Sequence, residues 1–171
     1  MHRFDSDELK KDLEALPLAA RVAFALACAE RVAAFTRGTN ELAQAGRTMA
    51  HRFLQGLAPD IEEIASLAAR MEASPDIDVD DVAACFYLIE CLRDHDPQGA
   101  IWTAERAYEA RDQAAQSDID WTIYTPAVES ALLAHPAVQA ELAAQAADIG
   151  DLLKDPACAP RIARRAAGGG F

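Results

Sequence analysis

Four histidines are the side chains best suited to catalysis or metal binding, because imidazole titrates near neutral pH and ligates metals. None lies three or four positions from another, the spacing that a metal site on a helix needs: they are His2, His51, His95 and His135. His135 precedes a proline at an expected helix start, which favours a capping or turn role. The chain has no GxxxxGKS/T, GxGxxG, GxSxG or HExxH segment. The sequence therefore predicts no catalytic residue, no metal site and no cofactor.

A run of alternating aspartates comes closest to a calcium-binding loop. Asp76, Asp78 and Asp80 occupy the first, third and fifth positions of an EF-hand pattern. The sixth position is Asp81 instead of glycine, and the twelfth is Tyr87 instead of glutamate. The sequence favours a simpler role, in which Asp78 or Asp80 caps the following helix and the other aspartates complement its dipole. Weak cation binding is the alternative.

Two carboxylates, Glu90 and Asp94, stand four positions apart and would share one face of a helix, where paired acids can share a proton or hold a metal. A di-metal centre of the ferritin type also needs a Glu-x-x-His motif on each of two helices. Glu90 is followed three residues later by Arg93, and Glu105 by Tyr108. The spacing therefore indicates no di-metal centre.

An adjacent acid and base, Glu30 and Arg31, interrupt the most apolar stretch of the chain. At least one of them is expected to be buried, and a buried charge needs a partner. We predict a structural ion-pair network that holds helices in register. An arginine that contacts a ligand is the alternative.

The elements that carry these residues are predicted to be helices. Alanine supplies 39 of the 171 positions, and it favours helices over strands. Apolar residues recur at three- and four-residue spacing between proline, glycine, asparagine and aspartate boundaries. Helices are expected over about 5–13, 17–38, 40–54, 59–73, 81–94, 97–116, 126–133 and 136–153. The aromatic run 121–125 has strand-like composition but is expected to be a connector or a helix start. We predict an all-α, single-domain bundle of about seven to eight helices.

The helical domain is expected to span residues 1–155. Residues 156–171 contain two prolines, three arginines and three consecutive glycines, which predict a basic, flexible tail. No apolar run follows a basic N-terminal segment and no stretch is long enough to span a bilayer, so a cytoplasmic location is expected. The cysteines form no CxxC pair and are expected to be reduced and buried, which agrees with that compartment: they are Cys28, Cys85, Cys91 and Cys158.

The formal charge of the chain is −12, and it is unevenly distributed. Residues 1–55 carry a net charge of +1, residues 56–155 carry −16 and residues 156–171 carry +3. Nucleic acids and anionic membranes are repelled by such a field, so binding to either is disfavoured. Solvated helix faces account for the acids most simply. The alternative is an acidic surface that steers toward a basic protein partner.

Two stretches of the chain are similar to a known family. The first runs from Leu13 to Phe35 with the core VAFALACAER, and the second runs from DVAAC at 81–85 to HPAVQAEL at 135–142. Together they resemble the YjaG-like family of small bacterial cytoplasmic proteins, a domain-of-unknown-function family. The resemblance covers most of residues 5–153 and implies an all-helical fold, but no reaction, cofactor or catalytic residue. The family's Glu-Arg pair is typically followed by a Pro-Asn-Tyr-like segment, where this chain has Val32-Ala33-Ala34-Phe35.

Three classes of function remain open at this point. The first is a non-catalytic, acidic protein-binding domain, most concretely an immunity protein that neutralises a cognate bacterial toxin. Its expected contact residues are Asp76, Asp78, Asp80, Asp81, Glu90, Asp94 and Asp96. The second is a cytoplasmic enzyme whose site is assembled from the dispersed residues Glu30, Arg31, His51, Glu90 and Trp102. The third is a structural or oligomerising module, such as a homodimer.

Overall fold

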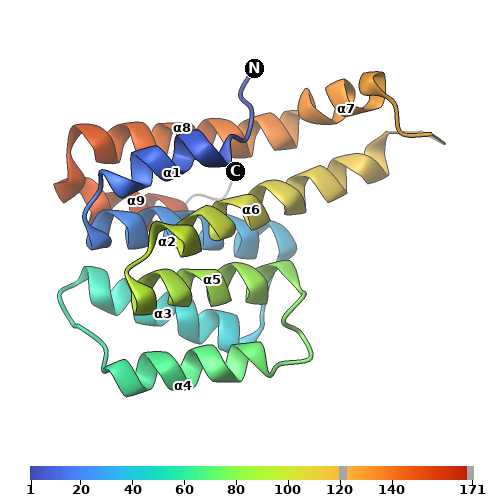
Figure 1. Ribbon diagram of the computed structural model, residues 1–171. Helices are drawn as coiled ribbons and strands as arrows, with labels where there is room; N and C mark the ends of the chain where they lie inside the picture. The colour runs from blue at the N-terminus through green and yellow to red at the C-terminus, as the bar shows by residue number, and fades with distance from the viewer. Residues whose placement is uncertain (120–122, 169–171) are drawn as a thin grey trace.

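The computed structural model describes residues 1–119 and 123–168, and this part of the chain is all-helical. It forms a single bundle of nine α-helices and one short 3-10 helix, slightly more than the seven to eight predicted (Figure 1). The elements are α1 (Ser6–Glu14), α2 (Leu18–Thr36), α3 (Glu41–Leu54), α4 (Ile61–Glu72), α5 (Asp80–Asp94), α6 (Pro97–Asp118), α7 (Pro126–Leu133), α8 (Pro136–Lys154), η1 (Pro156–Cys158) and α9 (Ala159–Gly168). Residues 120–122 lie outside the described residues, and they include the first two positions of the aromatic run 121–125.

Most helices begin where a side chain can accept the free backbone N–H groups of the first turn. Asp5 accepts from Asp7 and Glu8 at the start of α1, as its position predicts. Asn40 caps α3 at the predicted helix start, and His135 caps α8 through Nδ1, which confirms the capping role expected of His135. Helices α6, α7 and α8 each carry a proline in the first turn, where no backbone donor is required.

The start of α5 differs from the sequence prediction. Its N-cap residue is Val79, and no side chain makes a capping hydrogen bond there. The expectation that Asp78 or Asp80 caps this helix was therefore wrong. Acidic residues in the first turn of α5, Asp80 and Asp81, still complement the positive end of the helix dipole.

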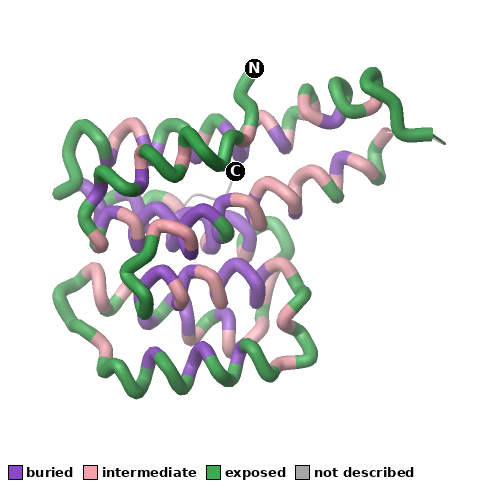
Figure 2. Tube along the Cα trace, viewed as in Figure 1, coloured by how far each residue is buried: buried purple, intermediate pink, exposed green. Residues whose placement is uncertain are grey.

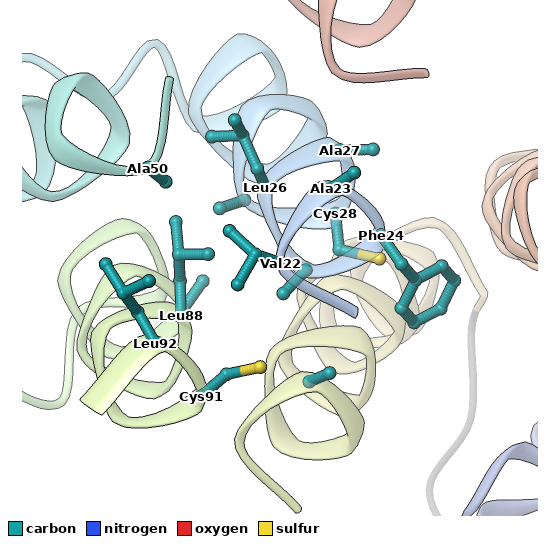
Figure 3. Packing of buried hydrophobic residues seen from close by; sticks show 14 of the residues in the cluster. Val22, Ala23, Phe24, Leu26, Ala27, Cys28, Ala50, Leu88, Cys91 and Leu92 are labelled. Atoms are coloured by element: carbon teal, nitrogen blue, oxygen red, sulfur yellow. The ribbon is translucent and has the colours of Figure 1, made fainter. Parts of the chain in front are cut away.

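Helix α2 lies at the centre of the bundle, as its apolar composition predicts. It packs against α3, α5, α6, α8 and α9, and most of its side chains are buried. Figure 3 shows Val22 and Leu26 of α2 facing Leu88 of α5, while Phe24 points to another side of α2. Figure 2 shows that buried residues are concentrated on the middle helices, whereas α4 is buried on only one side. Helix α4 is therefore an edge helix.

A second, smaller apolar cluster lies at the far end of α6. Ala115 of α6 packs with Leu132 of α7 and with Val138 and Leu142 of α8. In Figure 1 the end of α6 and α7 extend past the rest of the bundle. Phe4 stacks on Tyr108 of α6 with ring centroids 5.6 Å apart, which fixes the N-terminal segment near this cluster.

The segment after residue 155 corrects the prediction of a flexible tail. Residues 156–158 form η1 and residues 159–168 form α9, which packs along α2. Ile162 and Ala163 are buried, and Arg165 pairs with Asp148 and Asp151 of α8. Pro156 and Pro160 stand in first turns, where proline is compatible with a helix, so they do not interrupt it. Residues 169–171 lie outside the described part of the chain.

None of the helices described is both long enough and apolar enough to cross a membrane.

Candidate functional site

The Glu30–Arg31 pair divides between two separate ion networks, because consecutive residues of a helix point in different directions. Arg31 is buried and turns toward α8. Its Nε lies 3.0 Å from Glu141 Oε2, and its Nη1 lies 2.7 Å from Asp148 Oδ2. Glu141 and Asp148 are themselves buried and stand seven positions apart on one face of α8. The expected buried ionic network is thus present, with partners from another helix.

Further contacts complete the Arg31 network. Arg31 Nη2 donates to Cys28 Sγ at 3.3 Å, and Gln145 Nε2 donates to Glu141 Oε1 at 3.0 Å. Arg165 of α9 pairs with the other oxygen of Asp148. Burial raises the pKa of the Cys28 thiol well above its usual value, so Cys28 is a neutral thiol and not a nucleophile. The network joins α2, α8 and α9, and its groups are used for structure.

Glu30 belongs to the second network, between α2, α3 and α5. Its Oε1 lies 2.9 Å from His51 Nε2, and its Oε2 lies 3.7 Å from Arg47 Nε. Arg47 Nη1 lies 2.5 Å from Asp81 Oδ1. This network accounts for His51, which the sequence offers as a candidate for a dispersed active site.

Asp81 is a contact residue predicted from the sequence that the structure rules out. It is 1% exposed and held by Arg47, so no partner can reach it. Burial raises the pKa of Asp81, and Arg47 opposes that rise. The Oδ2 atom of Asp81 accepts no hydrogen bond from the described residues. A Cβ atom on Gly38 would lie 2.2 Å from it, so Gly38 is the residue that makes room for Asp81.

The residues of the proposed dispersed enzyme do not meet. Glu30 and His51 contact each other, but Arg31 faces α8. Glu90 pairs with Arg93 on the exposed side of α5, and Trp102 of α6 packs on Tyr87 with ring centroids 5.2 Å apart. Burial raises the pKa of Glu90, with Arg93 opposing the rise and Asp94 and Glu72 adding to it. These residues form no common pocket.

The acidic contact residues predicted from the sequence separate into two groups. Asp76 and Asp78 are exposed before α5, and Asp94 and Asp96 are exposed at its other end. A helix of this length separates its ends by about 20 Å at 1.5 Å per residue. Asp80 and Glu90 are half-buried between the two groups. The exposed acids therefore form two separate patches at opposite ends of α5.

The first group continues along α4, and together they form what we call the α4 edge. Exposed carboxylates on α4 and on the segments that flank it define this edge: Asp60, Glu62, Glu63, Glu72, Asp76 and Asp78. Arg70 is the exposed cation of α4, and Arg52 of α3 lies 3.2 Å from Glu63. Leu57, Ile61 and Val79 expose aliphatic side chains at the two ends of the edge. The sequence indicated only Asp76 and Asp78 of this edge, because its other acids are spread over a helix face.

Hollows on the surface of the described residues include one between α1 and α8 and one between α3 and α4. The larger, of about 630 Å³, is a groove between the N-terminal segment with α1 and the outer face of α8. Leu9, Leu142, Ile149 and Leu153 line it with apolar groups, and Glu8 and Asp12 line it with acids. The smaller, of about 460 Å³, lies between α3 and α4. No motif in the sequence indicated the groove, because its two walls are more than a hundred residues apart in the chain.

Within residues 1–119 and 123–168 there is no cluster of three or more histidine, cysteine, aspartate or glutamate side chains that could hold a metal ion. No family model, no curated protein and no solved structure matches this chain. The similarity to the YjaG-like family therefore stays a prediction.

Proposed function

We propose that this chain is a non-catalytic, acidic protein-binding domain. The observation that carries the proposal is the sign of the exposed charge between residues 56 and 155. In the described part of that range, the exposed carboxylates are Asp60, Glu62, Glu63, Glu72, Asp76, Asp78, Asp94, Asp96, Asp118, Glu129 and Asp155. The exposed cations are Arg70, Arg93 and Lys154. Such an excess attracts a basic partner and accelerates its association.

Internal use of the reactive groups also supports a binding function over a catalytic one. Arg31, Arg47 and His51 are each engaged by carboxylates inside or at the margin of the bundle. An active site needs a pocket where such groups converge with free functional atoms. Neither the groove between α1 and α8 nor the hollow between α3 and α4 contains either ion network as a whole.

The α4 edge is the surface that we assign to the partner. It combines acids with the exposed aliphatic residues Leu57, Ile61 and Val79, and protein interfaces use such a mixture of an apolar contact and a polar rim. The edge retains Asp76 and Asp78 from the sequence prediction and excludes Asp81. Two copies of the chain would repel each other through this edge, which disfavours a homodimer built on it.

The most concrete form of this function is an immunity protein. A toxin that acts on nucleic acid carries a basic surface, because its substrate is a polyanion. A small acidic domain can cover that surface and exclude the substrate. This form implies a cytoplasmic location and a cognate bacterial toxin as partner.

Affinity capture from the host, with the wild-type chain and two variants as baits, tests the binding function. The first variant neutralises the α4 edge through Glu72→Gln, Asp76→Asn and Asp78→Asn. The matched control makes the same change of charge elsewhere, through Asp7→Asn, Glu14→Gln and Glu129→Gln. We expect one basic, stoichiometric protein that the wild type and the control retain at low salt, that the edge variant loses, and that high salt releases. A host that yields no such protein would refute the proposal.

The immunity form has its own test once that protein is identified. Expression of the purified partner's coding sequence alone should arrest growth, and co-expression of this chain should restore it. The edge variant should restore growth less than the control does. A partner that does not arrest growth would exclude the immunity form and leave a different protein-binding function.

A further inference from the structure

The groove between α1 and α8 is a second surface, and its walls combine apolar and acidic side chains. On one side Glu8 and Asp12 stand four positions apart on α1, so both carboxylates lie along the same face of that helix. On the other side Leu153 of α8 is 43% exposed, although it is a large aliphatic residue. Asp5 and the cation Arg3 also line the groove, so its carboxylates outnumber its arginine three to one beside the apolar contact.

The N-terminal segment closes one end of the groove and is fixed in place. The backbone N–H of His2 donates to Gln139 Oε1 at 2.8 Å, and Gln139 Nε2 donates to the carbonyl oxygen of His2 at 2.9 Å. Phe4 stacks on Tyr108 of α6. These contacts hold this wall of the groove in position.

A side-chain amide of α8 lines the groove. Gln145 is 6% exposed and lines the groove, and its Nε2 donates inward to the carbonyl oxygen of Ala104 at 3.0 Å and to Glu141 Oε1 at 3.0 Å. Its Oε1 accepts no hydrogen bond from the residues that the structure describes. This oxygen is not enclosed from solvent, so a donor from a ligand, such as an ammonium or guanidinium group, can bond to it.

Gly150 adds an independent observation. It lies inside α8 and lines the groove, and a Cβ atom built on it would meet no described atom within 4 Å. No packing contact therefore requires glycine at this position, although glycine is the poorest helix former after proline. The absence of a side chain keeps the groove open along α8.

The length of the groove indicates what fits in it. From Leu142 to Leu153 the α8 wall extends over about 16 Å, or about three helical turns. We propose that the groove binds a short amphipathic helix of a protein partner, with lysine or arginine side chains beside its apolar face. The apolar face contacts Ile149 and Leu153, and the basic side chains reach Glu8, Asp12 and Gln145. The groove lies across the bundle from the α4 edge (Figure 1), so this inference does not depend on the proposed function.

Fluorescence anisotropy with a synthetic probe tests the inference on the full chain. The probe is a labelled three-turn peptide of leucine and lysine whose pattern gives one apolar and one basic helical face. Its first control replaces every lysine by glutamate, and its second control scrambles the order of the same residues. We expect the wild-type chain to bind the amphipathic lysine peptide and neither of the controls.

Variants then locate the binding. Gly150→Leu places a side chain in the groove, and we expect it to weaken binding by about tenfold or more while circular dichroism shows an unchanged fold. The pair Glu8→Gln and Asp12→Asn should weaken binding and lower its dependence on salt. The matched pair Glu62→Gln and Glu63→Gln on the α4 edge should leave binding unchanged.

Three results would overturn the inference: no binding of the lysine peptide, equal binding of the scrambled peptide, or unchanged binding to Gly150→Leu. An effect of the α4 edge pair equal to that of the groove pair would show attraction by overall charge only. None of these results bears on capture of a partner by the α4 edge, so the two proposals fail separately.

Discussion

Arg31 forms ion pairs with two carboxylates in the interior, and Arg165 shares one of them, Asp148. Glu141 and Asp148 are each almost fully buried, and Arg31 bonds to both. Removal of one partner from a buried ion pair leaves an uncompensated charge in a medium that solvates it poorly. The network therefore makes the position of α8 on α2 sensitive to a single side chain.

We expect Arg31→Met to lower the free energy of unfolding by about 3–5 kcal/mol, the usual cost of breaking a buried pair from one side. Urea denaturation followed by circular dichroism measures this change. The control Arg52→Met removes an exposed pair with Glu63 and should cost no more than about 1 kcal/mol. Adding Glu141→Gln to Arg31→Met should recover part of the loss. Equal stability of the two single variants would contradict this account of the network.

Glu90 should make stability depend on pH in a defined direction. Burial raises its pKa above the value of 4.5 expected in the unfolded chain, so the folded state binds the proton more tightly. Its contribution to stability is then greatest below that value and is lost as the pH rises through the folded-state pKa. Glu90→Gln keeps an acceptor for Arg93, which donates to Glu90 Oε2 at 2.7 Å. We expect the variant to be more stable than wild type at pH 7 and to lose this advantage near pH 4, as urea midpoints would show. A constant difference across this range would contradict the assignment.

At the scale of single residues, the sequence indicates which groups are unusual but not where they lie. The position of Glu30 and Arg31 in an apolar stretch predicted that at least one of them is buried, and the burial of Arg31 confirms this. Asp81 belongs to a run of aspartates that reads as a solvated cap, yet it is buried because Gly38 and Arg47 meet it from other elements. Contacts between residues this far apart in the chain depend on how helices pair, and periodicity within one helix does not specify the pairing.

At the scale of elements, helix positions follow closely from local chemistry. Caps at Asp5, Asn40 and His135, and prolines in first turns, mark boundaries that the sequence alone predicts. Helix α9 was missed because two prolines and a run of glycines resemble the composition of a linker. A proline breaks a helix only where its missing N–H is needed, and Pro160 lies in the first turn of α9. The packing of α9 against α2 then depends on the buried Ile162, and the composition of the segment did not indicate that this residue is buried.

Two glycines inside helices provide a matched test of packing between elements. A Cβ atom on Gly99 of α6 would lie 2.5 Å from the backbone nitrogen of Cys91 and 2.6 Å from the carbonyl oxygen of Tyr87, both on α5. We expect Gly99→Ala to force α5 and α6 apart and to lower the free energy of unfolding by about 1–3 kcal/mol. Gly150→Ala meets no such obstacle and should raise it by about 1 kcal/mol, since alanine is the better helix former. Chemical denaturation of both variants measures the two changes. A loss of stability in Gly150→Ala would show that a side chain at position 150 does meet an obstacle.

At the scale of the whole molecule, the net charge of −12 opposes compaction. Repulsion among exposed carboxylates is screened by salt over about 10 Å at 0.1 M, whereas buried pairs such as Arg31–Asp148 are screened much less. We expect the thermal midpoint to rise with sodium chloride, by about 2–4 °C for each kcal/mol of repulsion removed. Calorimetry at increasing salt measures it. A thermal midpoint that falls with salt would mean that exposed ion pairs stabilise the fold by more than the repulsion among carboxylates destabilises it.

The four cysteines are all free and buried, as their spacing predicts, and this has a consequence for how the protein opens. Burial raises the pKa of Cys85 and of Cys91 to about 12, so these two thiols present almost no thiolate to an alkylating reagent or an oxidant. Chemical modification must therefore wait for an opening of the structure. Cys158 lies in η1 at the edge of the core, while Cys28 lies at its centre. The modification rate of Cys158 therefore reports how often the C-terminal helix detaches. The modification rate of Cys28 reports how often the entire bundle opens, so the two rates distinguish local from global opening.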